Sequence, residues 1–229
     1  MNVLNIDSST KIFSLAVSQN ENILSSSSLK LEKALSASII PMIDSTLKKA
    51  KFSLRDIDGF AVGLGPGSFT SLRVGLSTVK AFGIATQKPV VGVVSLDVIA
   101  QGAKELGLDQ ICVLCDAKRN MVFSGIYKVK DSQIKRVRAY SLSFLKDVLK
   151  RIKGDCLFIG DGVEDSEKEI KAYFKGKKNK IVFGGEEYNS VQASNLAALS
   201  FKRFKNKKTD NINTLTPMYL YPKDCQVRR

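Results

Sequence analysis

The stretch Gly63-Leu64-Gly65-Pro66-Gly67-Ser68-Phe69-Thr70 lies between an apolar run at 60–62 and a helical pattern at 72–84. Three glycines and a proline within five residues predict a tight hinge between a strand and a helix, because glycine adopts conformations that other residues rarely reach. Ser68 and Thr70 fall where helix caps occur, and a helix N-terminus favours anions. A structural turn and a site for phosphate or a partner both remain open, since neither G-x-G-x-x-G nor a P-loop is present.

The chain contains no histidine among its 229 residues. This absence excludes Ser-His-Asp and Cys-His catalysis, His-ligated metal sites and the commonest general acid or base at neutral pH. Catalysis would have to use carboxylate, lysine, tyrosine or cysteine chemistry, or a metal held by oxygen ligands. The sequence therefore predicts no catalytic residue and no metal site.

The four cysteines are few for this length, and two of them, Cys112 and Cys115, fall within a predicted strand. Residues three apart in a strand point to opposite faces, so this C-x-x-C spacing makes a poor zinc clamp. We expect buried thiols in a reducing compartment. The amino end lacks a basic region followed by a long apolar run, which favours a cytoplasmic protein without a membrane anchor.

The formal net charge is +14, and residues 107–229 supply most of it with 25 basic and 14 acidic side chains. Such a surplus attracts polyanions. The clusters at 175–180 and 202–208 are candidates for RNA contact, but a solvated surface explains them better. Direct contact with tRNA therefore stays open at this point.

The order of predicted elements is repeated. In the first half, strands at 3–6, 12–17 and 23–29 precede a helix at 31–51 that Pro41 is expected to kink. They are followed by a strand at 59–63, a helix at 71–86, a strand at 90–93 and a helix at 96–106. A helix between neighbouring apolar strands implies a parallel crossover.

The second half restarts after a linker at 107–109. It has predicted strands at 110–116, 121–129 and 134–140, a helix at 142–152, a strand at 156–160, a helix at 164–174, a strand at 180–184 and a helix at 190–204. This repeat predicts an amino lobe at 1–106 and a carboxyl lobe at 107–229, each a mixed sheet with crossover helices. Two such lobes are typical of the α/β fold of actin, Hsp70 and sugar kinases, which clasp a nucleotide.

In that fold, the first hairpin carries a phosphate-binding turn with an aspartate near the metal. Here the turn is Asp7-Ser8-Ser9-Thr10, without the glycine usual in active ATPases. Asp7, Ser8 and Ser9 are candidate nucleotide-turn residues. Alternatively, Asp7 forms the turn by accepting hydrogen bonds from local N–H groups.

Several motifs, in this order, resemble the bacterial TsaB (YeaZ) family of tRNA threonylcarbamoyladenosine biosynthesis. They are Ile6-Asp7-Ser8-Ser9, Leu35-Ser36 with Ile40-Pro41-Met42-Ile43-Asp44, Gly65-Pro66-Gly67-Ser68-Phe69-Thr70 with Leu72-Arg73-Val74-Gly75-Leu76, Cys115-Asp116-Ala117-Lys118 and Pro217-Met218-Tyr219-Leu220. The resemblance spans the full length, and the G-P-G-S-F-T-x-L-R-x-G block is its most specific part.

The resemblance implies a noncatalytic subunit that pairs with TsaD, the metal-holding transferase, and with the ATPase TsaE. It implies no cofactor on this chain alone, ATP or ADP at the interface of the complex, tRNA as substrate of the complex, and a homodimer as one state of the free protein. The missing histidines agree that this chain is not TsaD, which carries a histidine metal site.

The resemblance also implies that the amino lobes pair through their helices, here 31–51 and 71–86. The predicted interface residues are Leu35, Ile39, Met42, Ser71, Gly75, Thr78 and Phe82. The hinge residues Gly65, Gly67, Ser68, Thr70 and Arg73 are predicted to bind a phosphate or the partner. Leu35, Ser71 and Tyr221 depart from the family pattern of histidine, glycine and arginine.

Two other functions compete with the subunit hypothesis. Relatives were once described as glycoproteases, so a peptidase is one alternative, although no histidine or Ser-Lys pair is evident to activate a nucleophile. A stand-alone nucleotide-dependent kinase or ATPase is the other. Against it, the second lobe offers no glycine-rich adenosine motif beyond Gly184-Gly185.

Overall fold

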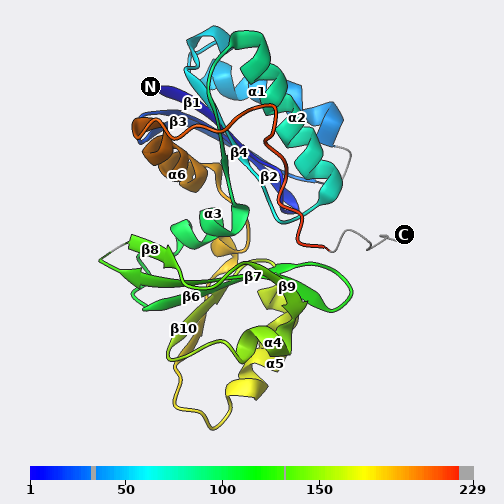
Figure 1. Cartoon of the computed structure of the whole chain (residues 1–229), viewed down its shortest axis with the longest axis vertical. Helices are drawn as coiled ribbons and strands as arrows, with labels where there is room; N and C mark the ends of the chain where they lie inside the picture. The colour runs from blue at the N-terminus through cyan, green and yellow to red at the C-terminus, as the bar shows by residue number, and fades with distance from the viewer. Residues whose placement is uncertain (32–34, 132, 222–229) are drawn as a thin grey trace. The chain divides into compact units, whose positions relative to one another are not determined.

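The computed structural model of the chain describes residues 1–31, 35–131 and 133–221. These residues divide into two compact units, each with its own sheet (Figure 1). Unit 1 comprises Met1–Gly102 and Ser190–Pro217, and unit 2 comprises Ala103–Asn189 with the chain from Met218 onward. Residues 32–34 of the predicted first helix and Cys225 lie outside the described residues.

Unit 1 contains a five-stranded sheet within its described residues, in the order β3-β2-β1-β4-β5. Its strands are β1 (Asn2–Asp7), β2 (Ile12–Gln19), β3 (Asn22–Lys30), β4 (Gly59–Gly63) and β5 (Val90–Val93). The first three pair antiparallel, whereas β1, β4 and β5 pair parallel. The predicted meander and parallel crossovers are confirmed.

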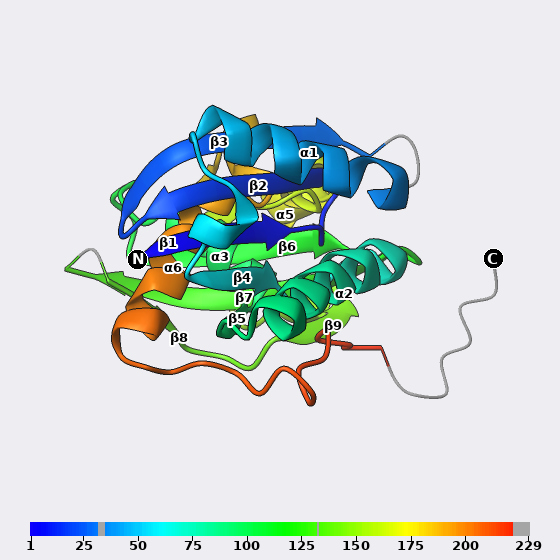
Figure 2. The same cartoon turned by 90° about the horizontal axis from the view of Figure 1, so that it is seen from above.

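Helices cover both faces of this sheet. On one side, α1 (Leu35–Lys49) and α2 (Phe69–Thr86) pack against each other and bury a core that includes Leu4, Ile6 and Val79 (Figure 2). On the other side lies α6 (Ala193–Lys205), near α3 (Ser95–Gly102). Successive residues on β1 alternate between these faces, so Leu4 and Ile6 face α1 and α2 while Asn5 faces α6.

The position of α6 differs from the predicted division of the chain at residue 106. The sequence order assigned the last helix to the carboxyl lobe, but α6 packs on the unit 1 sheet. Two hydrogen bonds join it there: Ser200 Oγ donates to Asn5 Oδ1 at 2.9 Å, and the Ala193 N–H donates to Ser14 Oγ at 2.8 Å. Helix α6 therefore supplies hydrogen-bond partners to the buried polar atoms of Asn5 and Ser14.

Unit 2 contains a six-stranded sheet within its described residues, in the order β11-β10-β6-β7-β8, with β9 paired to β7. Its elements are β6 (Gln110–Asp116), β7 (Met121–Lys130), β8 (Gln133–Arg136), β9 (Ser141–Phe144), α4 (Leu145–Leu149), β10 (Cys156–Ile159), α5 (Val163–Phe174) and β11 (Ile181–Phe183). Helices α4 and α5 cover one face. The predicted strand at 134–140 corresponds to β8, which ends at Arg136. The predicted helix at 142–152 is wrong at its start, where β9 lies, and only α4 within it is helical.

Short 3-10 helices complete the two units, at Leu54–Asp56 in unit 1 and Glu186–Tyr188 in unit 2. Helix α1 continues through Pro41. The carbonyl that Pro41 leaves without a helical donor belongs to Ala37, which is exposed and can bind water. No helix in the described ranges is both long and apolar enough to cross a membrane.

Candidate functional site

The hinge connects β4 to α2 and is fastened at several points. The Gly65–Pro66 peptide bond is cis, and Gly65 has a φ of 86°, in the region that favours glycine. Its N–H donates to Ser95 Oγ at 3.0 Å, and its carbonyl accepts the Ser95 N–H at 2.8 Å. The Ser68 N–H donates to the Ser9 carbonyl at 2.9 Å. The hinge is thus tied both to α3 and to the first hairpin.

Close backbone approach explains the remaining hinge glycines. A Cβ on Gly63 would lie 1.7 Å from Asp7 Oδ2, and one on Gly67 would lie 2.0 Å from the Ser9 carbonyl oxygen. Gly75, in the second turn of α2, would place a Cβ 2.4 Å from Ser8 Oγ. Each distance is shorter than any real contact of that kind. These glycines allow the turn that begins at Asp7 to seat against the hinge.

Asp7 is completely buried in this arrangement. Its Oδ1 accepts the Ser9 N–H at 2.8 Å, and its Oδ2 accepts Ser95 Oγ at 2.7 Å. Burial raises the pKa of Asp7, while the hydrogen bonds from Ser9 and Ser95 oppose that rise. These contacts agree with the hypothesis that Asp7 forms the turn, because both of its oxygens accept hydrogen bonds from donors of the chain itself.

The start of α2 is exposed at Ser68, Phe69, Thr70 and Arg73. Ser68 is the N-cap residue, but its hydroxyl donates to Ser71 Oγ at 3.0 Å and makes no cap hydrogen bond, so the predicted capping role of its side chain is wrong. The Arg73 guanidinium lies 4.0 Å from the centre of the Phe69 ring. This cation–π pair is a surface feature of unit 1.

The predicted interface residues lie mostly on the inner side of α1 and α2. Leu35, Ile39 and Gly75 are buried and pack against unit 1 itself. As contacts to a partner they stay a prediction. Met42 and Phe82 are partly buried against the same core. The half-buried Ser71 and Thr78 complete the set, with Thr78 Oγ1 donating to the Val74 carbonyl at 2.9 Å and the Ser71 carbonyl accepting Ser8 Oγ at 2.8 Å.

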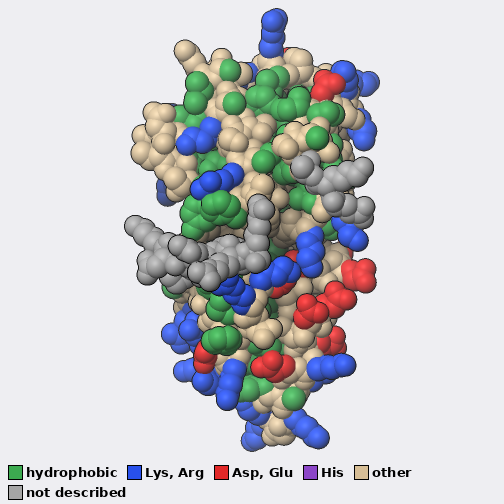
Figure 3. Space-filling model, turned by 90° about the vertical axis from the view of Figure 1, so that its right-hand side faces the viewer, with side chains coloured by type: hydrophobic (Ala, Val, Ile, Leu, Met, Phe, Trp, Pro, Cys, Tyr) green, Lys and Arg blue, Asp and Glu red, His purple; other side chains and the backbone are tan. Residues whose placement is uncertain are grey.

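The outward faces of the two helices carry large apolar side chains that the sequence analysis missed. Ile40 on α1 is 52% exposed, and Phe69 and Ile84 on α2 are 53% and 60% exposed. Figure 3 shows hydrophobic side chains in patches on one face of unit 1, between scattered charged groups. We call Ile40, Phe69 and Ile84 the outer apolar set. At helical spacing each of them falls beside the buried stripe of its own helix and outside it, a signal that was available in the sequence.

A groove lies beside α1 and adds to this surface. It has a volume of about 470 Å³ and is lined by Ser27, Leu29, Ala37, Ser38, Pro41, Met42, Ser45 and Lys49. Its lining comes from the outer strand β3 and from the exposed side of α1. Met42 is the member of the predicted interface that reaches it.

The described cysteines are buried in unit 2, as predicted. Burial raises the pKa of the Cys112 and Cys156 thiols, which keeps them protonated and unreactive. Among the described residues there is no group of three or more His, Cys, Asp or Glu side chains placed to hold a metal ion.

Tyr221, one of the departures from the family pattern, donates to the Ala117 carbonyl and packs edge-on against Phe123 at 5.8 Å between ring centres.

Two mixed sheets flanked by helices define the class, which is the two-lobed α/β fold of actin-like ATPases. A solved structure described as YeaZ from Pseudomonas aeruginosa superposes with a TM-score of 0.80 at 22% identity, covering 96% of this chain and 99% of that one. Component A of the (R)-2-hydroxyglutaryl-CoA dehydratase of Acidaminococcus fermentans gives a TM-score of 0.52 at 12% identity, covering 89% and 98%.

Sequence comparison identifies the family. The model for TsaD, tRNA N6-adenosine threonylcarbamoyltransferase, matches residues 23–220. The tRNA threonylcarbamoyladenosine biosynthesis protein TsaB of Bacillus subtilis is 27% identical over 96% of this chain and 94% of its own length. The TsaB protein of Escherichia coli is 24% identical over the same shares. The chain belongs to the TsaD family and, within it, to the TsaB (YeaZ) branch, which takes part in tRNA threonylcarbamoyladenosine biosynthesis.

Proposed function

We propose that this chain is a noncatalytic subunit that binds and activates a TsaD-like transferase through α1 and α2. The observation that carries this proposal is the outer apolar set on the exposed side of the helix pair. Large apolar side chains at the centre of a patch are the residues that usually supply binding energy between proteins. The groove beside α1 extends the patch toward β3.

The hinge supports this role because it fixes where α2 begins. Its hydrogen bonds to Ser9 and Ser95 hold the first turn of α2 against the sheet of unit 1. Phe69 and Arg73 are therefore presented on a rigid base. A surface that is already ordered loses less entropy when it binds.

Activation follows from selective binding. A partner with two conformations shifts toward the one that this surface binds better, by as much as the difference between the two affinities allows. No group on this chain has to react. We propose that a TsaE-like ATPase joins the pair, that tRNA is the substrate of the complex, and that ATP or ADP binds at the complex interface.

The two competing functions gain less support. A peptidase needs an activated nucleophile, but the described cysteines are buried and the chain has no histidine. A stand-alone kinase or ATPase would use the turn at Asp7, Ser8 and Ser9 for phosphate. The hinge backbone occupies that turn, and both Asp7 oxygens already accept hydrogen bonds.

The test measures binding to the TsaD-like protein of the same organism by isothermal titration calorimetry. The Ile84→Asp variant places a charge in the outer apolar set, and we expect its affinity to fall by about tenfold or more. Leu106→Asp is the matched control, because Leu106 is 44% exposed and lies in unit 2. Equal affinities for the wild type and both variants would move the interface elsewhere.

The free protein offers a second readout of the same surface. We propose that the outer apolar set pairs with a second copy when no partner is present. Light scattering after size-exclusion chromatography should then show a dimer for the wild type and a monomer for Ile84→Asp. Adding the TsaD-like protein should dissociate the dimer, since both use one surface.

A further inference from the structure

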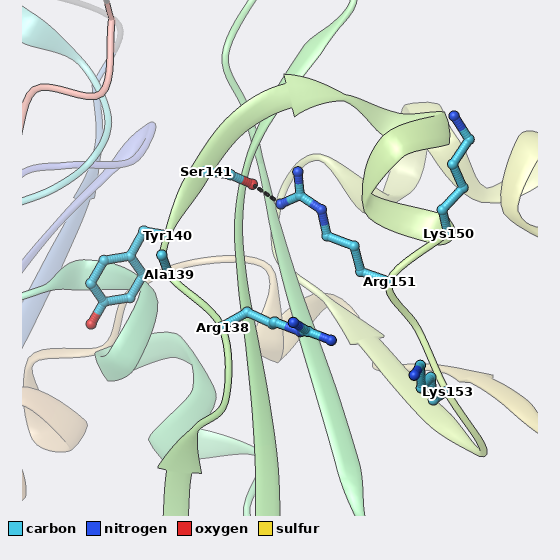
Figure 4. Close-up of a pocket in the computed structure, with 7 residues that line it drawn as sticks. All are labelled: Arg138, Ala139, Tyr140, Ser141, Lys150, Arg151 and Lys153. Atoms are coloured by element: carbon cyan, nitrogen blue, oxygen red, sulfur yellow. Dashed lines mark hydrogen bonds between the residues drawn. The ribbon is translucent and has the colours of Figure 1, made fainter.

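A pocket in unit 2 is lined mainly by positively charged and polar side chains. It has a volume of about 430 Å³ and lies between the segment joining β8 to β9 and the residues that follow α4. Its lining consists of Arg138, Ala139, Tyr140, Ser141, Lys150, Arg151 and Lys153 (Figure 4). Four of these seven residues carry a positive charge and none carries a negative one. We call it the basic pocket.

The cations of the basic pocket are partly held in place and partly uncompensated. Arg151 Nη1 donates to Ser141 Oγ at 3.2 Å, and Figure 4 shows Arg138 extending toward the segment that carries Arg151 and Lys153. Asp147 offsets one charge, because its Oδ1 accepts Lys150 Nζ at 2.8 Å. Within the described residues, Arg138 and Lys153 form no ion pair. Guanidinium groups placed this way suit phosphate oxygens, which they can bind through two parallel hydrogen bonds.

A second, independent feature lies on the neighbouring hairpin. Lys128 on β7 stands directly opposite Lys135 on β8. Side chains directly opposite in an antiparallel pair share one face, so two like charges there destabilise the hairpin. An anion bound between the two ammonium groups would relieve this repulsion.

The lysine pair and the basic pocket lie on the same face of the unit 2 sheet. Alternate residues of β7 share a face, so Lys128 lies on the face of Val122 and Ile126, which pack with α4. Ser141 of the pocket pairs with Ser124 and shares that face too. The cationic side chains thus form a row along one face of the sheet. A single phosphate would occupy only the pocket, whereas a ligand with several phosphates can contact the whole row.

We propose that the basic pocket and the Lys128–Lys135 pair bind the phosphate backbone of an RNA. A polyanion with regularly spaced charges matches a row of cations from two segments of chain. The branch's role in tRNA modification makes a transfer RNA the appropriate probe. The proposal does not depend on the TsaD-like partner, since it concerns unit 2 of the chain by itself.

The experiment measures fluorescence anisotropy of a labelled transfer RNA transcript with the full chain over a series of salt concentrations. The test variant is Arg138→Gln/Lys153→Gln, which removes two exposed charges with no ion pair in the described structure. We expect the affinity to fall by about tenfold at moderate salt and the slope of log K against log salt to decrease by about two.

The matched control is Lys202→Gln/Lys205→Gln, which removes the same charge from exposed positions on α6 of unit 1. We expect this variant to keep most of the affinity. A further variant, Arg138→Lys, keeps the charge but loses the guanidinium fork, and should show an intermediate loss. Circular dichroism checks that all variants are folded.

Three results would overturn the proposal. Equal losses in the two double variants would mean that net charge alone attracts the RNA. If the wild-type protein shows no measurable, salt-dependent binding to the RNA, the chain does not have the proposed RNA-binding function. Displacement of the RNA by inorganic phosphate at micromolar concentration would assign the pocket to a single small anion instead.

Discussion

Unit 1 and unit 2 are both mixed sheets with crossover helices, but the surfaces beside their helices differ. In unit 1, both oxygens of the buried Asp7 accept hydrogen bonds from Ser9 and Ser95, and α1 and α2 carry the exposed side chains of Ile40, Phe69 and Ile84. In unit 2, cationic side chains before β9 and after α4 line a pocket. The same α/β architecture therefore carries an apolar surface suited to a protein in unit 1 and a basic surface suited to a polyanion in unit 2.

The largest expected effect breaks the base of the unit 1 surface. In Gly67→Ala the new Cβ would meet the Ser9 carbonyl oxygen, a backbone atom that cannot rotate away. We expect the free energy of unfolding to fall by about 3 kcal/mol, as for overpacked sites. Urea denaturation followed by circular dichroism measures it.

Gly154→Ala is the control for this substitution, because Gly154 has a φ of 88° but open space around it. It should cost only the backbone strain, about 1 kcal/mol. Equal losses at the two positions would show that the hinge does not seat on the first hairpin as described.

Salt should separate the two surfaces next. Raising the salt from about 50 to 200 mM should weaken RNA binding by at least about tenfold, because phosphate contacts release counterions. Association with the TsaD-like partner should change by less than about threefold, since apolar contacts are not screened. Calorimetry and anisotropy on the same preparation give both values. A similar salt dependence for both would mean that one surface serves both ligands.

The buried carboxylate of unit 1 predicts a pH dependence. Because the folded-state pKa of Asp7 is raised above its ordinary value of 3.8, the native state binds the proton more tightly than the unfolded state. Its contribution to stability is therefore greatest below pH 3.8 and decreases as the pH rises toward the folded-state pKa. In Asp7→Asn this decrease should vanish.

Urea denaturation at a series of pH values from 4 to 8 measures this difference. The free energy of unfolding of the wild type, minus that of Asp7→Asn, should decrease with rising pH. A constant difference would contradict the raised pKa.

The smallest expected effect concerns the lysine pair of unit 2. Lys128→Thr removes the repulsion with Lys135 and should stabilise the free protein by a few tenths of a kcal/mol, about 0.3, while weakening RNA binding. Lys130→Thr is the control, because Lys130 stands opposite the neutral Gln133. Thermal unfolding compares the two. A larger gain in the control would remove the argument from repulsion.

Much of the fold was predictable from periodicity, because apolar strands and amphipathic helices report their own burial. The placement of α6 was not predictable in this way, because the periodicity of a helix does not show which sheet it packs on. Here the hydrogen bonds to Asn5 and Ser14 join α6 to the sheet of unit 1. The division at residue 106 failed for that reason.

The candidate sites were predicted less well. The interface prediction named apolar residues such as Leu35 and Ile39, which are buried in the core of unit 1. It did not name the exposed Ile40 beside them. The basic pocket was missed because Arg138 and Lys153 are 15 positions apart in sequence, and only the fold brings their segments together. The tight turn between β4 and α2 was predicted correctly, because glycine spacing indicates close backbone approach. Its role in binding a phosphate or a partner stays a prediction.

Hydrogen–deuterium exchange of the chain, alone, with the TsaD-like partner and with transfer RNA, tests the contrast between the two surfaces most directly. The account predicts two separate footprints: slower exchange at 36–45 and 69–85 with the partner, and at 128–153 with the RNA. Protection of 128–153 by the partner, with no change in α1 or α2, would contradict it.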